Sequence, residues 1–291
     1  MPVVSDHQPS ALRTLAVLGR VSNLPTVWSN CLVGWWLGGA GATERLLALL
    51  AGASAVYLGG MFLNDAFDVR FDRAHRPERP IPSGAISEGR VWQWGLGLAA
   101  FGATALGLLG WGTALLTLVL LGLVLAYNAI HKQTPLAVLL VAGCRFMVYL
   151  VAGSASVGGI SGLTVWGGLA LGAYVVGISL IARRESVPGP RPRWPLLLLA
   201  VPMLLAWLAN EAHWRERAFA LSLLLTLWML PFLHHLLRRP SGNPAFSVSG
   251  LLAGIVIVDW LAVGGGSPAQ AFAFAACFGL ALLGQRYVPA T

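Results

Sequence analysis

The stretch LLALLAGASAVYLGGMFLNDAFDVRFDRAHRPERPIPSG, residues 46–84, contains the pattern that decides the fold of this chain. Its first part, residues 46–64, consists almost entirely of apolar and small side chains. About 20 such residues in a helix are enough to cross the ~30 Å hydrocarbon core of a bilayer. Acids, arginines and prolines follow at once, between Asp65 and Gly84. We therefore expect a transmembrane helix that leads into an acid-rich segment at the membrane boundary.

The same apolar character extends over the whole chain. Of its 291 residues, 57% are hydrophobic and only 10% are charged, and the mean hydropathy is +0.73. Soluble domains average about 25% charged residues, so this composition excludes that class. Apolar runs recur from end to end, and they predict membrane-spanning helices at residues 21–40, 46–64, 92–110, 112–128, 135–155, 163–183, 195–210, 217–236, 248–265 and 268–285.

These runs predict an all-α integral membrane protein, a bundle of nine or ten transmembrane helices. The runs are solidly apolar, whereas the strands of a membrane barrel would alternate lipid-facing and lumen-facing residues. The count stays open between nine and ten, because the seventh run is short and only the turn GGGSPAQ, residues 264–270, separates the last two. We find no linker long enough to divide the chain and expect a single domain over residues 1–291.

The placement of the basic residues predicts an orientation in the cell membrane. Most of the 19 Lys and Arg residues lie in loops on the same side as residues 65–84. Arg45, Arg215 and Arg217 lie in the opposite loops, and Arg145 lies within a span. Because positive loops stay in the cytoplasm, we expect the N-terminus and the acid-rich segment to be cytoplasmic. The net charge of +8 then reflects membrane topology, and no basic domain indicates a nucleic-acid partner.

The acids after the second span recur at helical spacing. If the helix continues past Asn64, each residue turns it by about 100°, so Asn64, Asp68 and Asp72 fall within an arc of about 80°. Asp65 points about 100° away from Asn64, and we interpret it as a supporting or capping group. Like charges one turn apart repel each other, and a bound cation removes this repulsion. Ligands that contain only oxygen select hard ions such as Mg²⁺.

A solvated loop is the alternative interpretation, with the acids paired to Arg70, Arg73 and Arg76. The regular spacing and the position at the end of a span favour the metal site. Mg²⁺ is typically held by one or two carboxylates together with substrate phosphates. Arg76, Arg79 and the turn RPIPSG, residues 79–84, would supply guanidinium groups for the phosphate oxygens. The segment therefore predicts a site for a metal–diphosphate complex.

At this point the sequence resembles a known family, the UbiA superfamily of intramembrane prenyltransferases. The segment NDAFDVRFD, residues 64–72, fits the family signature NDxxDxxxD, and RPERPIPSG, residues 76–84, is similar to the turn that follows it. GRVSNLPTVWSN, residues 19–30, resembles the first helix of the family. YNAIHKQTPLAVLLVAGCRFMVYLVAG, residues 127–153, resembles the passage from its fourth helix to its fifth. The resemblance implies a bundle of helices around a central cavity, in which Mg²⁺ assists the transfer of an isoprenyl group to an acceptor.

The resemblance also implies roles for individual residues. Asn64, Asp68 and Asp72 would hold the metal and its diphosphate, with Asp68 and Asp72 taken as catalytic. The other positions that it implies for binding are Arg20, Asn23, Arg79 and Lys132 at the phosphate end, and Tyr127, Asn128 and Arg145 facing the cavity.

One segment departs from the family pattern. Family members carry a second acidic motif, typically DxxxD, after the sixth helix, where this chain reads AYVVGISLIARRESVPG, residues 173–189. Glu185 is the only acid there, and we interpret it as the candidate base or second metal ligand. Arg183 and Arg184 either replace the charge of a second ion, or the ionisation chemistry is weakened. Such sequences resemble a divergent branch of the superfamily that includes EboC-like proteins.

Two charged residues lie inside predicted spans, Arg145 in the fifth and Asp259 in the ninth. A charge at the centre of a membrane helix costs about 2.5–3.5 kcal/mol on insertion scales, so each requires an explanation. For Arg145 we favour a role in the cavity. For Asp259 we favour a structural role, with Arg145 as its possible partner.

Two hypotheses follow from the sequence. The first is an integral-membrane, Mg²⁺-dependent prenyltransferase whose partners are an isoprenyl diphosphate, an unknown acceptor and the lipid bilayer. The alternative is a non-catalytic protein of the same fold that binds or exports a lipid or secondary metabolite. The degenerate second motif motivates the alternative.

Overall fold

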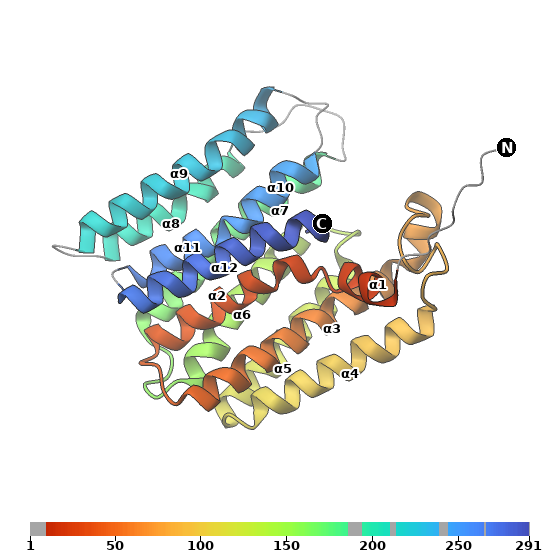
Figure 1. Cartoon of the computed structure of the whole chain (residues 1–291), viewed down its shortest axis with the longest axis horizontal. Coiled ribbons are helices and arrows are strands. Elements are labelled where there is room, and N and C mark those ends of the chain that lie inside the picture. The colour runs from red at the N-terminus through yellow and green to blue at the C-terminus, as the bar shows by residue number, and fades with distance from the viewer. Residues whose placement is uncertain (1–9, 186–193, 210–213, 239–243, 265, 291) are drawn as a thin grey trace.

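A computed structural model describes residues 10–185, 194–209, 214–238, 244–264 and 266–290. These residues fold into helices and contain no strand, as the apolar runs predict (Figure 1). In chain order the elements are α1 (Ala11–Leu18), the 3-10 turn η1 (Val21–Asn23), α2 (Leu24–Leu37), α3 (Thr43–His75), α4 (Glu88–Gly107), α5 (Trp111–Ile130), α6 (Ala137–Ala155), α7 (Gly162–Glu185), α8 (Pro195–Ala209), α9 (Trp214–Arg238), α10 (Pro244–Ala253), α11 (Ile255–Val263) and α12 (Pro268–Tyr287).

Seven helical segments in the described part of the chain are long and apolar enough to cross a membrane. They are α3, α5, α6, α7, most of α9, α12 and the segment Phe246–Val263 of α10 and α11. Helix α2 has 14 residues and α8 has 15, fewer than the ~20 of a full crossing. The expected all-helical, multi-pass membrane protein is thus confirmed, whereas the count of nine or ten transmembrane helices is not.

Helix α3 is one unbroken helix of 33 residues and includes all the acids of the signature segment. At 1.5 Å per residue it is about 50 Å long, so it is longer than the hydrocarbon core is thick. It ends at His75 because Arg76 precedes Pro77 and leaves the helical region, with φ −143°. The helix therefore continues well past residue 64, where the apolar run ends, as the spacing argument requires.

Small residues bring α3 and α4 into close contact. A Cβ atom added to Gly59 would lie 2.8 Å from both the backbone nitrogen of Ala99 and the carbonyl oxygen of Gly95. One added to Gly102 would lie 2.7 Å from the carbonyl oxygen of Gly52. Such backbone approach through small residues is typical of helix pairs in membranes. The packing gives the acid-bearing helix a close, rigid partner along much of its length.

Helix α2 occupies the centre of the bundle. It packs against α6, with α3, α4 and α5 on one side and α7, α8 and α9 on the other (Figure 1). Two buried clusters share it, because Val33 belongs to the cluster of the C-terminal half and Val27 and Trp35 to that of α3, α5 and α6. Polar side chains on α2 are therefore enclosed by other helices.

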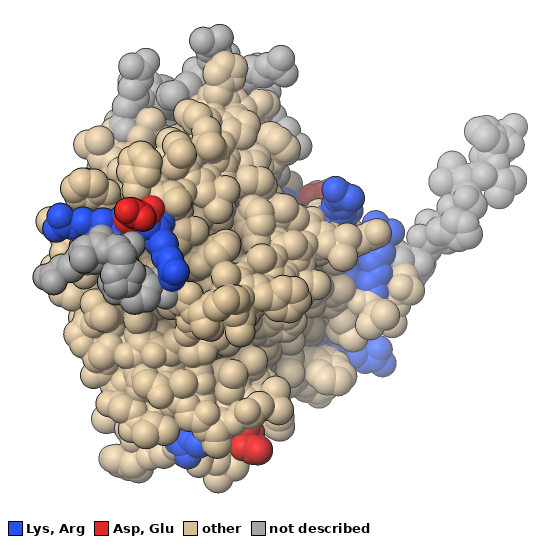
Figure 2. Space-filling view, turned by 60° about the vertical axis from the view of Figure 1, so that its left-hand side comes forward, with Lys and Arg blue, Asp and Glu red and all other residues tan. Residues whose placement is uncertain are grey.

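The surface agrees with a position in a membrane. On the face shown in Figure 2, the charged side chains form small groups near the margins of a broad uncharged area. Large apolar side chains such as Leu118, Leu169 and Phe272 are more than 45% exposed, which a lipid environment accommodates.

Candidate functional site

The end of α3 carries four oxygen-bearing side chains on one side of the helix. Asn64, Asp65 and Asp72 are each 4% exposed, and the side chain of Asp68 is 14% exposed. Asp65 lies seven positions before Asp72, so in an ideal helix the two differ by only about 20°. All four therefore fall within an arc of about 100°. Asp65 and Asn64 both contact Arg20, and the interpretation of Asp65 as a supporting or capping group stays a prediction.

Two arginines from different segments contact Asp65. Nη2 of Arg20, in the turn between α1 and η1, lies 3.4 Å from Asp65 Oδ1, and Nη1 of Arg79 lies 4.0 Å from the same atom. Burial lowers the pKa of the Arg79 guanidinium, and the nearby charge of Arg20 lowers it further. Two cations therefore converge on one carboxylate, which leaves positive charge available for an anion.

Asn64 connects three elements at this site. Arg20 Nη2 donates to Asn64 Oδ1 at 3.1 Å, and Asn64 Nδ2 donates to Asn128 Oδ1 on α5 at 3.2 Å. Asn128 Nδ2 in turn donates to the carbonyl oxygen of Gly60 at 3.1 Å. Arg20 has a left-handed backbone, with φ 42° and ψ 51°, which is uncommon for a residue other than glycine. Arg20 is the residue that directly precedes η1, and its side chain contacts α3.

Asp68 is held by the segment that follows α5. Lys132 Nζ lies 2.8 Å from Asp68 Oδ1, and His131 Nε2 lies 3.3 Å from Asp68 Oδ2. Lys132 Nζ also lies 3.8 Å from the ring centroid of Phe71, and the ring of Tyr127 stacks on His131 at 5.0 Å. Sequence reasoning missed His131. Its place beside Lys132, within the segment YNAIHKQTP, is the signal that could have found it.

Several buried polar atoms around this cluster have no hydrogen-bond partner among the described residues. They are Asp72 Oδ1 and Arg20 Nε in the cluster itself, and Ser22 Oγ and Asn23 Oδ1 in η1, which directly follows Arg20. Leaving such a group unsatisfied costs about 1–3 kcal/mol, so a cluster of them indicates a site that a polar ligand would complete. Only the Oδ1 atom of Asn23 is available to a ligand, because its Nδ2 donates to the carbonyl oxygen of Ala290 at 2.8 Å.

The donors present fit a metal that arrives with a substrate better than one that the protein holds alone. Within the described ranges, no group of three or more His, Cys, Asp and Glu side chains could hold an ion unaided. Asp72 has an unpaired buried oxygen, Asp68 is engaged by Lys132 and His131, and Asn64 is engaged by Arg20. Carboxylate and amide oxygens are hard ligands of the kind that Mg²⁺ accepts, and phosphate oxygens usually complete its shell.

A second polar network lies among α2, α6 and α11. Arg145 Nη1 donates to Asn30 Oδ1 at 2.8 Å, and Asn30 Nδ2 donates to Asp259 Oδ2 at 2.7 Å. Ser29 and Tyr149 also donate to the carboxylate of Asp259, which is fully buried. The expected partnership of Arg145 and Asp259 is therefore indirect, since Asn30 lies between them.

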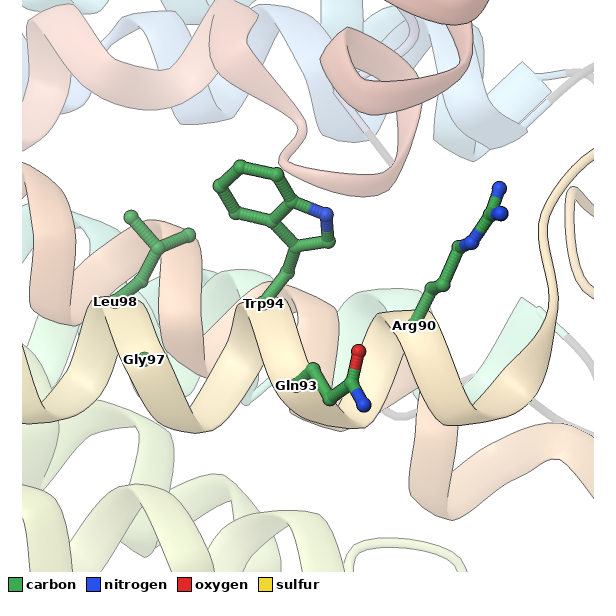
Figure 3. A pocket seen from close by; sticks show the side chains of 5 residues that line it. All are labelled: Arg90, Gln93, Trp94, Gly97 and Leu98. Carbon is green, nitrogen blue, oxygen red and sulfur yellow. The ribbon is translucent and has the colours of Figure 1, made fainter.

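Two further expectations concern α7 and the cavity. Glu185 ends α7, and its side chain lies outside the described residues. A groove of about 570 Å³ lies on the flank of α4 and is lined by Arg90, Gln93, Trp94, Gly97 and Leu98, with Arg90 and Trp94 projecting from the same side of the helix (Figure 3). None of these lining residues is a predicted site residue, so this groove is not the central cavity that the resemblance implies.

The fold and this cluster define a class: a multi-pass helical membrane protein with acids and arginines gathered at the end of its longest helix. The chain belongs to the UbiA prenyltransferase family, whose sequence model matches residues 23–255. The family expected from the signature segment is thus confirmed.

Relatives and solved structures agree with this assignment. Digeranylgeranylglyceryl phosphate synthase from Methanothrix thermoacetophila is 33% identical over 127 residues, 43% of this chain and 47% of the relative. The synthase from Ignicoccus hospitalis is 42% identical over 91 residues, 31% of this chain and 30% of the relative. The matched segments thus span less than half the length of these relatives.

Two solved structures have the same fold at low sequence identity. A UbiA homolog from Aeropyrum pernix K1 has a TM-score of 0.64 at 18% identity, covering 84% of this chain and 97% of that one. A UbiA homolog from Archaeoglobus fulgidus, described as bound to GPP and Mg²⁺, has a TM-score of 0.64 at 14% identity, covering 91% and 99%. At these identities the likeness establishes the fold alone.

Proposed function

We propose that this protein is an integral-membrane prenyltransferase that moves an isoprenyl group from a Mg²⁺-bound isoprenyl diphosphate to an acceptor. The observation that carries the proposal is the end of α3, where one buried carboxylate oxygen of Asp72 has no partner among the described residues. The neighbouring acids there contact cations from other segments, Arg20 and Arg79 at Asp65 and Lys132 at Asp68. The family, the synthases among its relatives and the neighbour bound to GPP and Mg²⁺ support the same reading.

The charges divide into two roles in this proposal. Asp68, Asp72 and Asn64 would hold the ion through their oxygens, and Arg20, Arg79 and Lys132 would bind phosphate oxygens through charge-assisted hydrogen bonds. A bound Mg²⁺ would stabilise the negative charge that develops on the departing diphosphate. When the allylic C–O bond breaks, its electron pair leaves with the diphosphate. The acceptor then forms the new bond to the allylic carbon and releases a proton.

Lys132 has to change partners for this role. It now lies on Asp68 at 2.8 Å, so it neutralises the carboxylate that would take the ion. We propose that the entering complex moves the ammonium from Asp68 to a phosphate oxygen, which frees the carboxylate. Tyr127, Asn128 and Arg145 would complete the walls on the side of α5 and α6, and Asn23 those on the side of η1.

The proposal includes an orientation and a domain organisation. We place the N-terminus and the diphosphate site in the cytoplasm, because the loops on that side carry most of the Lys and Arg residues. We treat residues 1–291 as one domain, and the family match over residues 23–255 supports this. Labelling of a cysteine introduced at the exposed Ser83, in intact cells and in inverted vesicles, tests the orientation.

A second candidate function is binding or export of an isoprenoid or secondary metabolite without turnover. The engagement of Asp68 by two basic side chains favours it, because the chain itself neutralises a predicted metal ligand. Glu185 is the only acid in the segment where the family carries a second motif.

Release of diphosphate separates the two functions. The purified protein in lipid nanodiscs is incubated with Mg²⁺ and geranyl, farnesyl or geranylgeranyl diphosphate, with and without a membrane extract as the source of acceptor. A prenyltransferase releases diphosphate with at least one chain length and stops when EDTA is added. Mg²⁺-dependent binding without release at any chain length would instead establish the binding protein.

A further inference from the structure

Arg183 occupies the place where the family pattern calls for a second acidic motif. It lies near the end of α7 and is half-buried, and its Nη1 atom donates to two carbonyl oxygens of another segment. These are the oxygen of His131 at 2.9 Å and that of Thr134 at 2.7 Å. Both belong to the turn between α5 and α6, residues 131–134.

This turn needs a cation for a physical reason. The last carbonyl groups of a helix have no partner within it, and the partial negative charge at a helix C-terminus attracts positive side chains. Helix α5 ends at Ile130, and the turn continues it, with Gln133 N donating to Ile130 O at 2.8 Å and Thr134 N to the same oxygen at 3.2 Å. Arg183 thus binds the carbonyl oxygen of His131, the residue directly after α5, and shares that of Thr134 with the backbone nitrogen of Ala137 at the start of α6.

The turn carries the two basic side chains that contact Asp68, His131 and Lys132. Arg183 binds the backbone of His131 itself and of a residue two positions after Lys132. A shift of the turn would therefore move both basic groups away from α3.

We infer that Arg183 is a positioning residue, which holds the 131–134 turn so that Lys132 and His131 face Asp68 and the diphosphate site. This inference rests on the proposed function, because it assigns Arg183 to that same site. It differs from the idea that Arg183 replaces the charge of a second ion, since the charge here is directed at backbone oxygens. Arg183 acts through Lys132 and does not itself bind the phosphates.

A ligand-free measurement tests the first step. Hydrogen exchange of the amides of Gln133 and Thr134 is followed in the wild type, Arg183→Gln and the matched control Arg90→Gln, whose arginine lies on the flank of α4. We expect exchange to be about tenfold faster in Arg183→Gln and unchanged in the control, because loss of a hydrogen bond to a charged group releases the turn. Equal exchange in all three proteins would overturn the inference.

A double-mutant cycle tests the second step. The binding of geranyl thiolodiphosphate, which resists cleavage, is measured in the presence of Mg²⁺ for Arg183→Gln, Lys132→Ala and the double variant. We expect each single change to weaken binding by about tenfold, and the double change to be little worse than either, because coupled residues are not additive. A product of the two losses, about a hundredfold, would mean that Arg183 binds phosphate directly and would overturn the inference.

Two controls keep the outcomes distinct. Thermal unfolding in the same detergent checks that each variant is folded, and Arg183→Lys replaces Arg183→Gln in the cycle if the glutamine variant is not. The lysine keeps the charge but is shorter. A positioning role therefore predicts weaker binding than in the wild type, whereas a pure charge role predicts binding as strong as in the wild type. If the wild type itself does not bind the thiolodiphosphate, the proposed function fails, whatever the exchange experiment gives.

Discussion

Two groups of carboxylates and arginines in this molecule differ in how many of their polar atoms have a hydrogen-bond partner. In the network of α2, α6 and α11, Asp259 accepts from Ser29, Asn30 and Tyr149, and Asn30 uses both ends of its amide. At the end of α3, Asp72 Oδ1 and Arg20 Nε are buried and lack a partner in the part of the chain that the structure describes. The hydrogen bonds of the complete network explain it as a structural element, whereas the unpaired atoms of the α3 cluster fit the ligand site that we propose.

Because of this difference, we expect similar substitutions in the two groups to have opposite effects on stability and function. Removing a member of a satisfied buried network leaves its partners unpaired and destabilises the fold. Removing a group that has no partner relieves a penalty that the fold already bears. Substitution of Asp72 should therefore reduce function without reducing stability, and substitution of Asp259 should do the reverse.

The largest expected effect is at Asp72. Replacing Asp72 by Asn should reduce diphosphate release by about 100-fold or more, because Asp72 would hold the Mg²⁺ that stabilises the charge on the departing diphosphate. The unfolding temperature should stay the same or rise slightly, because the amide carries no charge beside Asp65. Release assays and thermal unfolding on the same preparation check this, and a large fall in unfolding temperature would place Asp72 with the structural network.

The next effect is at Asp259 and concerns stability. Asp259→Ala leaves the donors of Ser29, Asn30 and Tyr149 unpaired and should lower the free energy of unfolding by about 3 kcal/mol. Asp259→Asn is the matched control, since it keeps the size and one acceptor and should lose less. Denaturation in detergent measures both, and an alanine variant as stable as the wild type would break the comparison.

Salt should affect the α3 cluster and the Asp259 network differently, and this effect should be smaller than those of the substitutions. Raising the salt from about 0.1 M to 1 M shortens the screening length from about 10 Å to 3 Å. If Arg20, Arg79 and Lys132 bind the diphosphate as we propose, its binding should weaken by about fivefold. The fully buried Asp259 network should respond little, so the unfolding temperature should change by only a few degrees. Binding that is insensitive to salt would argue against phosphate contacts by these side chains.

The smallest effect is expected at an exposed ion pair near the cluster. Arg73 and Glu88 lie 3.2 Å apart, with side chains 59% and 40% exposed. Exposed pairs contribute about 0.2–1 kcal/mol, so Glu88→Gln should change stability by no more than that and leave diphosphate release intact. A loss of release in this variant would show that general surface charge, and not the buried cluster, governs the reaction.

The sequence predicted those features that depend on one segment at a time. Apolar runs predicted the all-helical membrane fold, and the four-residue spacing predicted that Asn64, Asp68 and Asp72 share a face of one helix. The number of membrane crossings was harder, because α2 is short and the ninth run divides into α10 and α11 near Gly254. The length of an apolar run does not show whether the buried helix within it is too short to cross the bilayer.

Features that depend on several segments were missed. His131 and the contacts of Arg183 depend on how α5, α6 and α7 meet. The Asp259 network requires Ser29 and Asn30 on α2 to face α11, and nothing in the separate runs predicts that meeting.

A structure of the protein with geranyl thiolodiphosphate and Mn²⁺ in place of Mg²⁺ tests the central claim most directly. The anomalous signal of Mn²⁺ should lie against the carboxylates of Asp68 and Asp72, with the diphosphate bridging the ion to Arg20, Arg79 and a displaced Lys132. An ion or a diphosphate bound elsewhere, with Lys132 still on Asp68, would contradict the account.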